Sequence, residues 1–129
     1  MKSIRSWFSG TDTPENSHWS ALKTNESVDE LIGNREKPQI IYKHSYRCAV
    51  SIFSKRSLET GLDDLAGIAD LHLVDVVSLR PVSAYITEKT GIRHESPQVI
   101  LLHNGAPFWS ASHGNVKLKN LQDALDELL

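Results

Sequence analysis

The sequence predicts one α/β domain: a three-layer α/β/α sandwich on a four-stranded mixed sheet, preceded by an N-terminal extension. Three observations support this prediction. Short apolar runs bounded by turn residues alternate with helical patterns along the chain. Asn104-Gly105 is a hairpin signal between the last two runs. A length of 129 residues with 40% hydrophobic content suits one compact core. We therefore place an irregular arm at residues 1–25 and the folded domain at 26–129.

The N-terminal segment is polar and contains two tryptophans, Trp7 and Trp19, which we expect to dock on the folded body. Ser27 followed by Glu30 matches a capping box, so a short helix is expected from there to about Arg35. The arm itself is expected to contribute little chemistry.

The central strand is predicted at residues 39–44, a short apolar run typical of a buried strand. A helix is expected to begin at Cys48 and to end near Gly61, a natural C-cap. Its apolar positions at helical spacing are Val50, Phe53, Leu58 and Leu62. The chain thus has a strand, a tight turn and a helix around its cysteine.

The second half of the chain supplies the remaining elements. In order, these are a strand at 70–77, a helix from Pro81 to Thr90 closed by Gly91, strands at 97–103 and 106–111, and an amphipathic helix at 117–129. Right-handed crossovers would place helices on both faces of the sheet. This element order is that of a thioredoxin-like domain.

Composition excludes several classes of function. Fourteen basic and sixteen acidic residues give a net charge of −2, so no overall field favours nucleic acid or an anionic membrane. No apolar run approaches the roughly 20 residues that span a bilayer, and the basic start lacks the apolar core of a signal peptide. A single cysteine forms no intrachain disulfide and fits a reducing compartment. We expect a soluble cytoplasmic protein.

Cys48 is the candidate nucleophile, because unpaired backbone N–H groups and the helix dipole favour a thiolate at a helix start. No Asp or Glu occurs between residues 39 and 58, whereas several basic or imidazole side chains do: Lys43, His44, Arg47, Lys55 and Arg56. We expect Lys43, His44 and Arg47 to support the thiolate. The alternative is that Cys48 is a small buried apolar residue without chemistry.

Ser51 occupies the position of the second cysteine in a CxxC motif, so the chain has no resolving thiol. A mixed disulfide on Cys48 would therefore be released by an external thiol, which is monothiol chemistry. Ser51 is also placed to hydrogen-bond the sulfur.

The Ser96-Pro97 bond precedes the third long strand, and both isomers of an X-Pro bond are open there. Thioredoxin-like domains place a cis-proline opposite the reactive cysteine, so Ser96 and Pro97 are candidate substrate-binding residues. The six histidines show no metal-ligand spacing. We therefore expect no metal site.

The segment KHSYRCAVS, residues 43–51, resembles the KHSxxC active-site segment of the monothiol bacilliredoxins, the YtxJ-like proteins of the bacillithiol system. Residues 80–105 and the following WSASH are similar to that family too, so the resemblance runs from about residue 32 to the C-terminus. It implies a thiol-disulfide oxidoreductase that removes bacillithiol from mixed disulfides on client proteins through Cys48. Bacillithiol would be the thiol co-substrate, with no bound cofactor. Ala49 stands where the family commonly has proline. Unlike proline, Ala49 has a backbone N–H that can donate a hydrogen bond.

Two other functions remain open at this point. Cys48 could be thiolated in a non-catalytic redox sensor or thioredoxin-like adaptor, whose partner binding changes without turnover. A cluster-binding protein of the monothiol glutaredoxin type is the third possibility, and the absence of glycine after Cys48 disfavours it.

Overall fold

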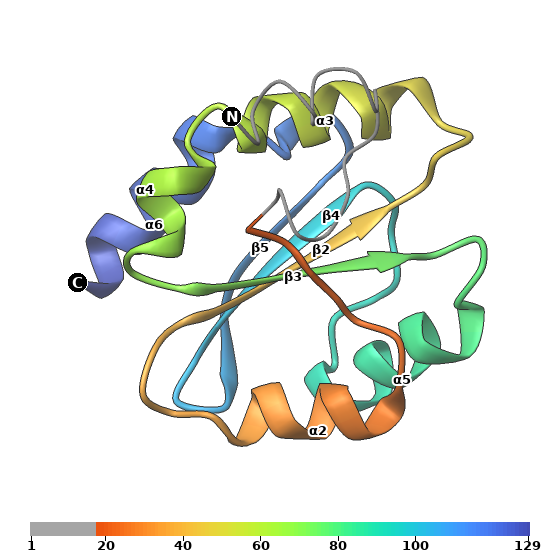
Figure 1. Cartoon of the computed structure of the whole chain (residues 1–129), viewed down its shortest axis with the longest axis horizontal. Coiled ribbons are helices and arrows are strands. Elements are labelled where there is room, and N and C mark those ends of the chain that lie inside the picture. The colour runs from red at the N-terminus through yellow and green to blue at the C-terminus, as the bar shows by residue number, and fades with distance from the viewer. Residues whose placement is uncertain (1–17) are drawn as a thin grey trace, which may run out of the picture.

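The computed structural model describes residues 18–129 and has a mixed sheet with helices on both faces (Figure 1). The strand order is β1-β3-β2-β4-β5, in which β1, β2 and β3 are parallel and β4 and β5 are antiparallel to their neighbours. The strands are β1 (Ser20–Ala21), β2 (Gln39–His44), β3 (Asp70–Asp75), β4 (Gln98–His103) and β5 (Ala106–Ser112). The helices are α2 (Asn25–Gly33), α3 (Ala49–Glu59), α4 (Leu62–Ala66), α5 (Arg80–Thr90) and α6 (Leu118–Leu128), with a 3₁₀ turn at His113–Asn115.

Strand β2 lies at the centre of the molecule and is buried along its whole length. Successive side chains of a strand point to opposite faces, so Ile40 and Tyr42 enter the core beneath α3, α4 and α6, whereas Ile41 enters the core beneath α2 and α5. Two apolar cores therefore flank one sheet. The predicted three-layer α/β/α arrangement is confirmed, and β2 has the predicted bounds.

The sheet has five strands in the described part of the chain, where the sequence predicted four. The additional strand, β1, comes from the arm and pairs in parallel with His72 and Leu73 of β3. Sequence patterns missed it because a two-residue strand of small and polar residues shows no alternation. Trp19 next to it is buried against Tyr42, with ring centroids 5.6 Å apart, so its expected docking is confirmed. Trp7 and the rest of the arm before residue 18 lie outside the described residues.

Two of the predicted helices differ from the observed ones by more than a residue at an end. Helix α2 is capped by Thr24, whose hydroxyl accepts a hydrogen bond from the Ser27 backbone N–H at 3.1 Å, so a cap at Ser27 is wrong by one turn. The helix expected to reach Gly61 is two helices, because α3 ends at Glu59 and α4 begins at Leu62.

The apolar pattern of α3 also proves misleading. Val50 and Phe53 are 45% and 67% exposed, although their spacing suggested a buried face. The face that meets the sheet is instead largely polar and consists of Ser51, Ser54, Lys55 and Leu58. A polar inner face next to Cys48 indicates that hydrogen bonds, as well as apolar contacts, set the position of α3 on the sheet.

No helix among residues 18–129 is long and apolar enough to cross a lipid bilayer.

The predicted hairpin joins β4 and β5 at Asn104 and Gly105, which both have positive φ angles, 53° and 81°. These values match a type I′ turn, which fits the twist of the flanking strands. A Cβ atom on Gly105 would lie 3.1 Å from the Ile32 carbonyl oxygen and 3.2 Å from Arg35 Nη2. The hairpin tip therefore needs glycine both for its backbone conformation and for its approach to α2.

Gly105→Ala should lower the free energy of unfolding by about 1 to 2 kcal/mol, the cost of a left-handed backbone for a residue with a Cβ. Gly33→Ala is the matched control, because no atom beyond its chain neighbours and its own helix backbone lies within 4 Å of its new Cβ. That change at the end of α2 should be neutral or stabilise by up to about 1 kcal/mol. Chemical denaturation of both variants checks this, and equal effects would contradict the account of the turn.

Candidate active site

Cys48 is the N-cap residue of α3 and is half-buried. Its backbone is extended, with φ −115° and ψ 122°, and its carbonyl accepts the first bond of the helix from Ile52 N at 3.2 Å. Its own N–H donates to the Ser45 carbonyl at 3.2 Å, which closes the turn between β2 and α3. The thiol therefore stands where the helix exposes its free N–H groups, as the sequence predicted.

Hydrogen bonds from the first turn of α3 lower the pKa of the Cys48 thiol. The largest effect comes from the Ser51 backbone N–H. Burial, the next largest, opposes it, and the Val50 N–H and the Ser51 hydroxyl lower the pKa further. All three groups stabilise the thiolate by donating to it. The thiolate is thus stabilised by the helix start and by the predicted contact with Ser51. The sequence analysis also expected a contribution from nearby cations.

Tyr42 holds this turn from beneath. Its buried hydroxyl donates to the Ser51 carbonyl at 2.8 Å, and the Ser51 hydroxyl oxygen accepts from the Ser45 N–H at 3.3 Å. Burial raises the pKa of Tyr42 far above its usual value, so the phenol keeps its proton. Sequence reasoning missed this residue because it lies in an apolar run and was assigned to the core. A tyrosine in a buried strand just before a reactive turn, with a hydroxyl that needs a partner, was the available signal.

His44 completes the support of Tyr42 and contributes no positive charge at neutral pH. Burial, aided by the charge of Lys55, lowers the pKa of His44 to about 4. Its Nδ1 lies 2.9 Å from the Tyr42 hydroxyl oxygen. Because the Tyr42 proton goes to Ser51, the His44 Nδ1 carries a proton and donates. The imidazole also meets the ring of Tyr46 edge-on at 4.2 Å.

Lys43 and Arg47, the other predicted supports, are not among the groups that shift the pKa of Cys48. The fully buried Lys43 places its Nζ 3.1 Å from His94 Nδ1, on the face of β2 opposite Tyr42. Arg47 is exposed, and its backbone N–H donates to the Ser45 hydroxyl at 3.3 Å. Of the predicted supporting residues, Ser51 contacts the thiol directly. His44 acts only through Tyr42, and Lys43 lies on the other face of the sheet.

The Ser96-Pro97 peptide bond is cis and precedes β4. Lys43 of β2 pairs with Gln98 of β4, so this bond lies beside the end of β2 from which the chain leads to Cys48. The Ser96 hydroxyl is buried and has no hydrogen-bond partner within residues 18–129. The two predicted substrate-binding residues thus lie at the same edge of the sheet as the thiol.

Exposed apolar side chains border Cys48. Four of them come from the turn before the helix and from its outer face: Tyr46, Val50, Ile52 and Phe53, which are 39% to 67% exposed. We call this group the α3 apolar surface. The chain from residue 39 to residue 58, which contains Cys48 and these four side chains, has no Asp or Glu.

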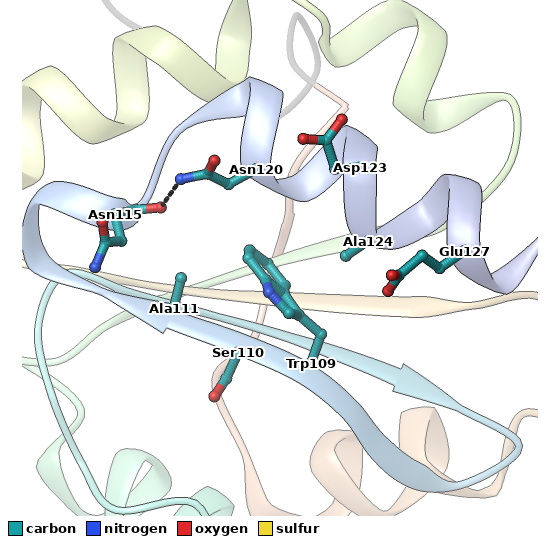
Figure 2. Close-up of a pocket in the computed structure, with 8 residues that line it drawn as sticks. All are labelled: Trp109, Ser110, Ala111, Asn115, Asn120, Asp123, Ala124 and Glu127. Carbon is teal, nitrogen blue, oxygen red and sulfur yellow. Dashed lines mark hydrogen bonds between the residues drawn. The ribbon is translucent and has the colours of Figure 1, made fainter.

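A separate pocket of about 420 Å³ lies between β5 and α6 (Figure 2). Trp109 of β5 faces Asp123 and Glu127 of α6 across it, and the Asn120 side chain closes one end by donating to the Asn115 carbonyl at 3.0 Å. No predicted site residue lines it. Across residues 18–129, no group of three or more His, Cys, Asp or Glu side chains is arranged to hold a metal ion.

Ser51→Ala should slow alkylation of Cys48 by iodoacetamide at pH 7 by about twofold to tenfold, because a hydrogen bond worth about 0.5 to 1.5 kcal/mol to the thiolate is lost. Ser54→Ala, which changes another buried serine of α3, serves as the control and should react like the wild type. The pH dependence of the alkylation rate should shift upward for the Ser51 variant alone. A parallel shift for Arg47→Gln would instead assign the thiolate stabilisation to the cation.

Lys43→Met should stabilise the protein at pH 7 by about 1 to 3 kcal/mol, because a desolvated ammonium is replaced by an apolar chain. Burial lowers the pKa of Lys43 from 10.5 to about 8, so the unfolded chain binds more protons between these values. Wild-type stability should therefore gain a contribution from Lys43 as pH rises from about 8 to 10.5.

That contribution should vanish in Lys43→Met and persist in Lys37→Met, which removes an exposed lysine paired with Asp70. Denaturant unfolding at several pH values measures it. An unchanged pH slope in Lys43→Met would show that this ammonium is not desolvated in the folded protein.

Comparison with known proteins identifies the family. The family model described as "Monothiol bacilliredoxin BrxC" matches residues 20–121. A solved structure described as "A putative oxidoreductase with a thioredoxin fold" is 28% identical, covers 81% of this chain and 91% of its own, and has a TM-score of 0.73. A solved structure of a Malassezia sympodialis thioredoxin is 17% identical, covers 84% of this chain and 89% of its own, and has a TM-score of 0.67, a likeness that shows the fold alone. The predicted thioredoxin-like fold is confirmed, and the chain belongs to the monothiol bacilliredoxin family, whose chemistry is thiol redox exchange.

Proposed function

We propose that this protein removes bacillithiol from mixed disulfides on client proteins through Cys48. The observation that carries the proposal is a thiolate stabilised by the first turn of α3 in a chain with a single cysteine. Membership of the monothiol bacilliredoxin family supports bacillithiol as the small thiol. The same single thiol supports a reducing compartment, and we propose the cytoplasm.

The exchange proceeds in two steps that balance electrons. The Cys48 thiolate attacks the bacillithiol sulfur of the mixed disulfide, the old S–S bond breaks, and the client cysteine leaves as a thiolate. The client is thereby reduced, and Cys48 holds bacillithiol as a new disulfide. A second bacillithiol thiolate then attacks the bacillithiol sulfur of that adduct, which frees the Cys48 thiolate and yields oxidised bacillithiol.

The surroundings of Cys48 support this role. The backbone beside the cis Ser96-Pro97 bond would align an incoming disulfide with the thiolate, as a strand edge binds an extended peptide. The α3 apolar surface would contact the client protein around its modified cysteine. Ser51 would stabilise the leaving Cys48 thiolate in the second step through the hydrogen bonds that lower its pKa.

Cys48→Ser should lose de-bacillithiolation of a modified client, while the wild type should sustain many turnovers with excess bacillithiol. The release of free client thiol over time measures both. Stoichiometric labelling of wild-type Cys48 without further release would contradict the proposal and favour a redox sensor or adaptor.

Ser51→Cys offers a matched test of the monothiol step, because it supplies the resolving cysteine that the chain lacks. Its bacillithiol adduct should resolve within the protein, whereas the wild-type adduct should persist until a thiol is added. Intact mass measured before and after bacillithiol addition distinguishes them. Spontaneous loss of the wild-type adduct would exclude dependence on an external thiol.

A further inference from the structure

A second pocket, of about 410 Å³, lies on the α5 side of the sheet, away from the core beneath α3. Its lining combines apolar and polar side chains from three segments: Val76 and Val77 after β3, Arg80, Ser83 and Ala84 of α5, and His94 before the cis-proline. None of these residues belongs to the site around Cys48 described above. We call it the α5 pocket.

The polar wall of the α5 pocket is joined to the buried Lys43. The Lys43 Nζ lies 3.1 Å from His94 Nδ1, and the Ser83 hydroxyl oxygen lies 2.9 Å from the same nitrogen. Burial and the charge of Lys43 lower the pKa of His94, against the opposing effect of the Glu95 carboxylate, and so favour the neutral imidazole. Because the Lys43 ammonium can only donate, Nδ1 carries no proton, and Nε2 carries the ring proton as a donor.

Two basic side chains at this pocket, Lys43 and Arg80, have no carboxylate partner among residues 18–129. Lys43 is fully buried. The carboxylates nearest in sequence are already engaged. Asp75 accepts from the Val77 and Ser78 N–H groups, and Glu95 contacts Arg93 and His113. A desolvated ammonium without a counter-charge is costly, and an anion in the pocket would offset that cost.

The start of α5 adds to the positive potential. The first turn of this 11-residue helix contains Arg80 and no acidic residue, and no side chain caps its N-terminus. Pro81 in this turn has no N–H, but the remaining N–H groups of the turn and the helix dipole favour an anion at such a place. The ammonium of Lys43, which lies behind the lining residue His94, and the open helix start thus point to the same sign of ligand charge.

The α5 pocket also opens at the edge of the sheet where Cys48 lies. Strands β2 and β3 are parallel and end together, and Val76 N donates to the His44 carbonyl at 3.0 Å. The loop from β2 to α3 and the loop from β3 to α5 are on the same side of the molecule in Figure 1. His94 lies two residues before Ser96. A small molecule joined to the Cys48 sulfur would therefore lie at the same end of the sheet as this pocket.

We propose that the α5 pocket binds an anionic oxygen group, a carboxylate or a phosphate, of the low-molecular-weight thiol that exchanges with Cys48. Arg80 and the His94 Nε2–H would contact the anion, and Lys43 would act behind them as a positioning residue and counter-charge. The assignment of the ligand as the exchanging thiol rests on the proposed function. The anion site itself does not.

Titration of the reduced wild-type chain, followed by amide chemical shifts, tests the anion site. Malate should cause saturable shifts that gather on residues 76–84 and 94, and dimethyl malate, which lacks the charges, should not. Inorganic phosphate is the second arm, and the tighter anion identifies a carboxylate or a phosphate as the natural group. Scattered shifts that do not saturate with either anion would overturn the proposal.

Arg80→Gln should weaken anion binding by about tenfold or more, because a charge-assisted contact is lost. Arg93→Gln removes the same charge one residue from His94, and its side chain, 91% exposed, does not line the pocket. That control should bind as the wild type does. Equal weakening in both variants would mean that anion binding depends only on the overall charge of this region, and would overturn the proposal of a specific anion site.

Adduct formation on Cys48 connects the pocket to the exchanging thiol. Arg80→Gln should slow the reaction with oxidised bacillithiol and leave the reaction with cystamine, which carries no anionic group, unchanged. Equal slowing with both disulfides would overturn the assignment of the ligand. Because the titration does not involve Cys48, loss of turnover would count against the proposed function alone, and loss of anion binding against this inference alone.

Discussion

The hydrogen bond from the Tyr42 hydroxyl to the Ser51 carbonyl ties the central strand to the first turn of α3. The inner face of this helix is largely polar near Cys48, so apolar packing alone would not fix the position of its first turn. The strand supplies a rigid origin, because β2 is buried and paired on both sides. The thiolate then receives its donors from a turn whose position is set by the middle of the sheet.

Adjacent residues of β2 serve the two faces of the sheet differently. Tyr42 faces α3 and supports the turn that carries Cys48, with His44 as its neutral donor. Lys43 faces α5 and places a desolvated ammonium behind His94 and Ser83. The KHS portion of the active-site segment thus contributes little charge to the thiol itself. Its basic residue is directed toward the opposite face, where the α5 pocket lies.

The elements with clear local signals could be predicted from the sequence. The bounds of β2, the closure of α5 by Gly91 and the Asn104-Gly105 hairpin follow from apolar runs and from backbone requirements that only a few residues meet. The place of Cys48 at a helix start followed in the same way, from a strand followed by a short turn. These features depend on residues close together in the chain.

Features that depend on distant contacts could not be predicted. Strand β1 exists because β3 offers a free edge, which two residues of sequence do not reveal. Val50 and Phe53 follow helical spacing but are exposed. The buried face of the helix contains Ser51 and Ser54, and the Ser51 carbonyl accepts the hydrogen bond from Tyr42. The separation of Lys43 from the thiol follows from strand alternation combined with the position of α3, and proximity in sequence suggested the opposite.

The most direct test of this account is the titration of the wild-type Cys48 thiol by thiolate absorbance, with Cys48→Ala as the blank. Donors from the first turn of α3 should hold its pKa below the value of about 8.5 found for an unperturbed cysteine. The same titration of Tyr42→Phe, which loses the bond to Ser51, should give a higher pKa than the wild type. A wild-type thiol that titrates at or above the ordinary value would contradict the account.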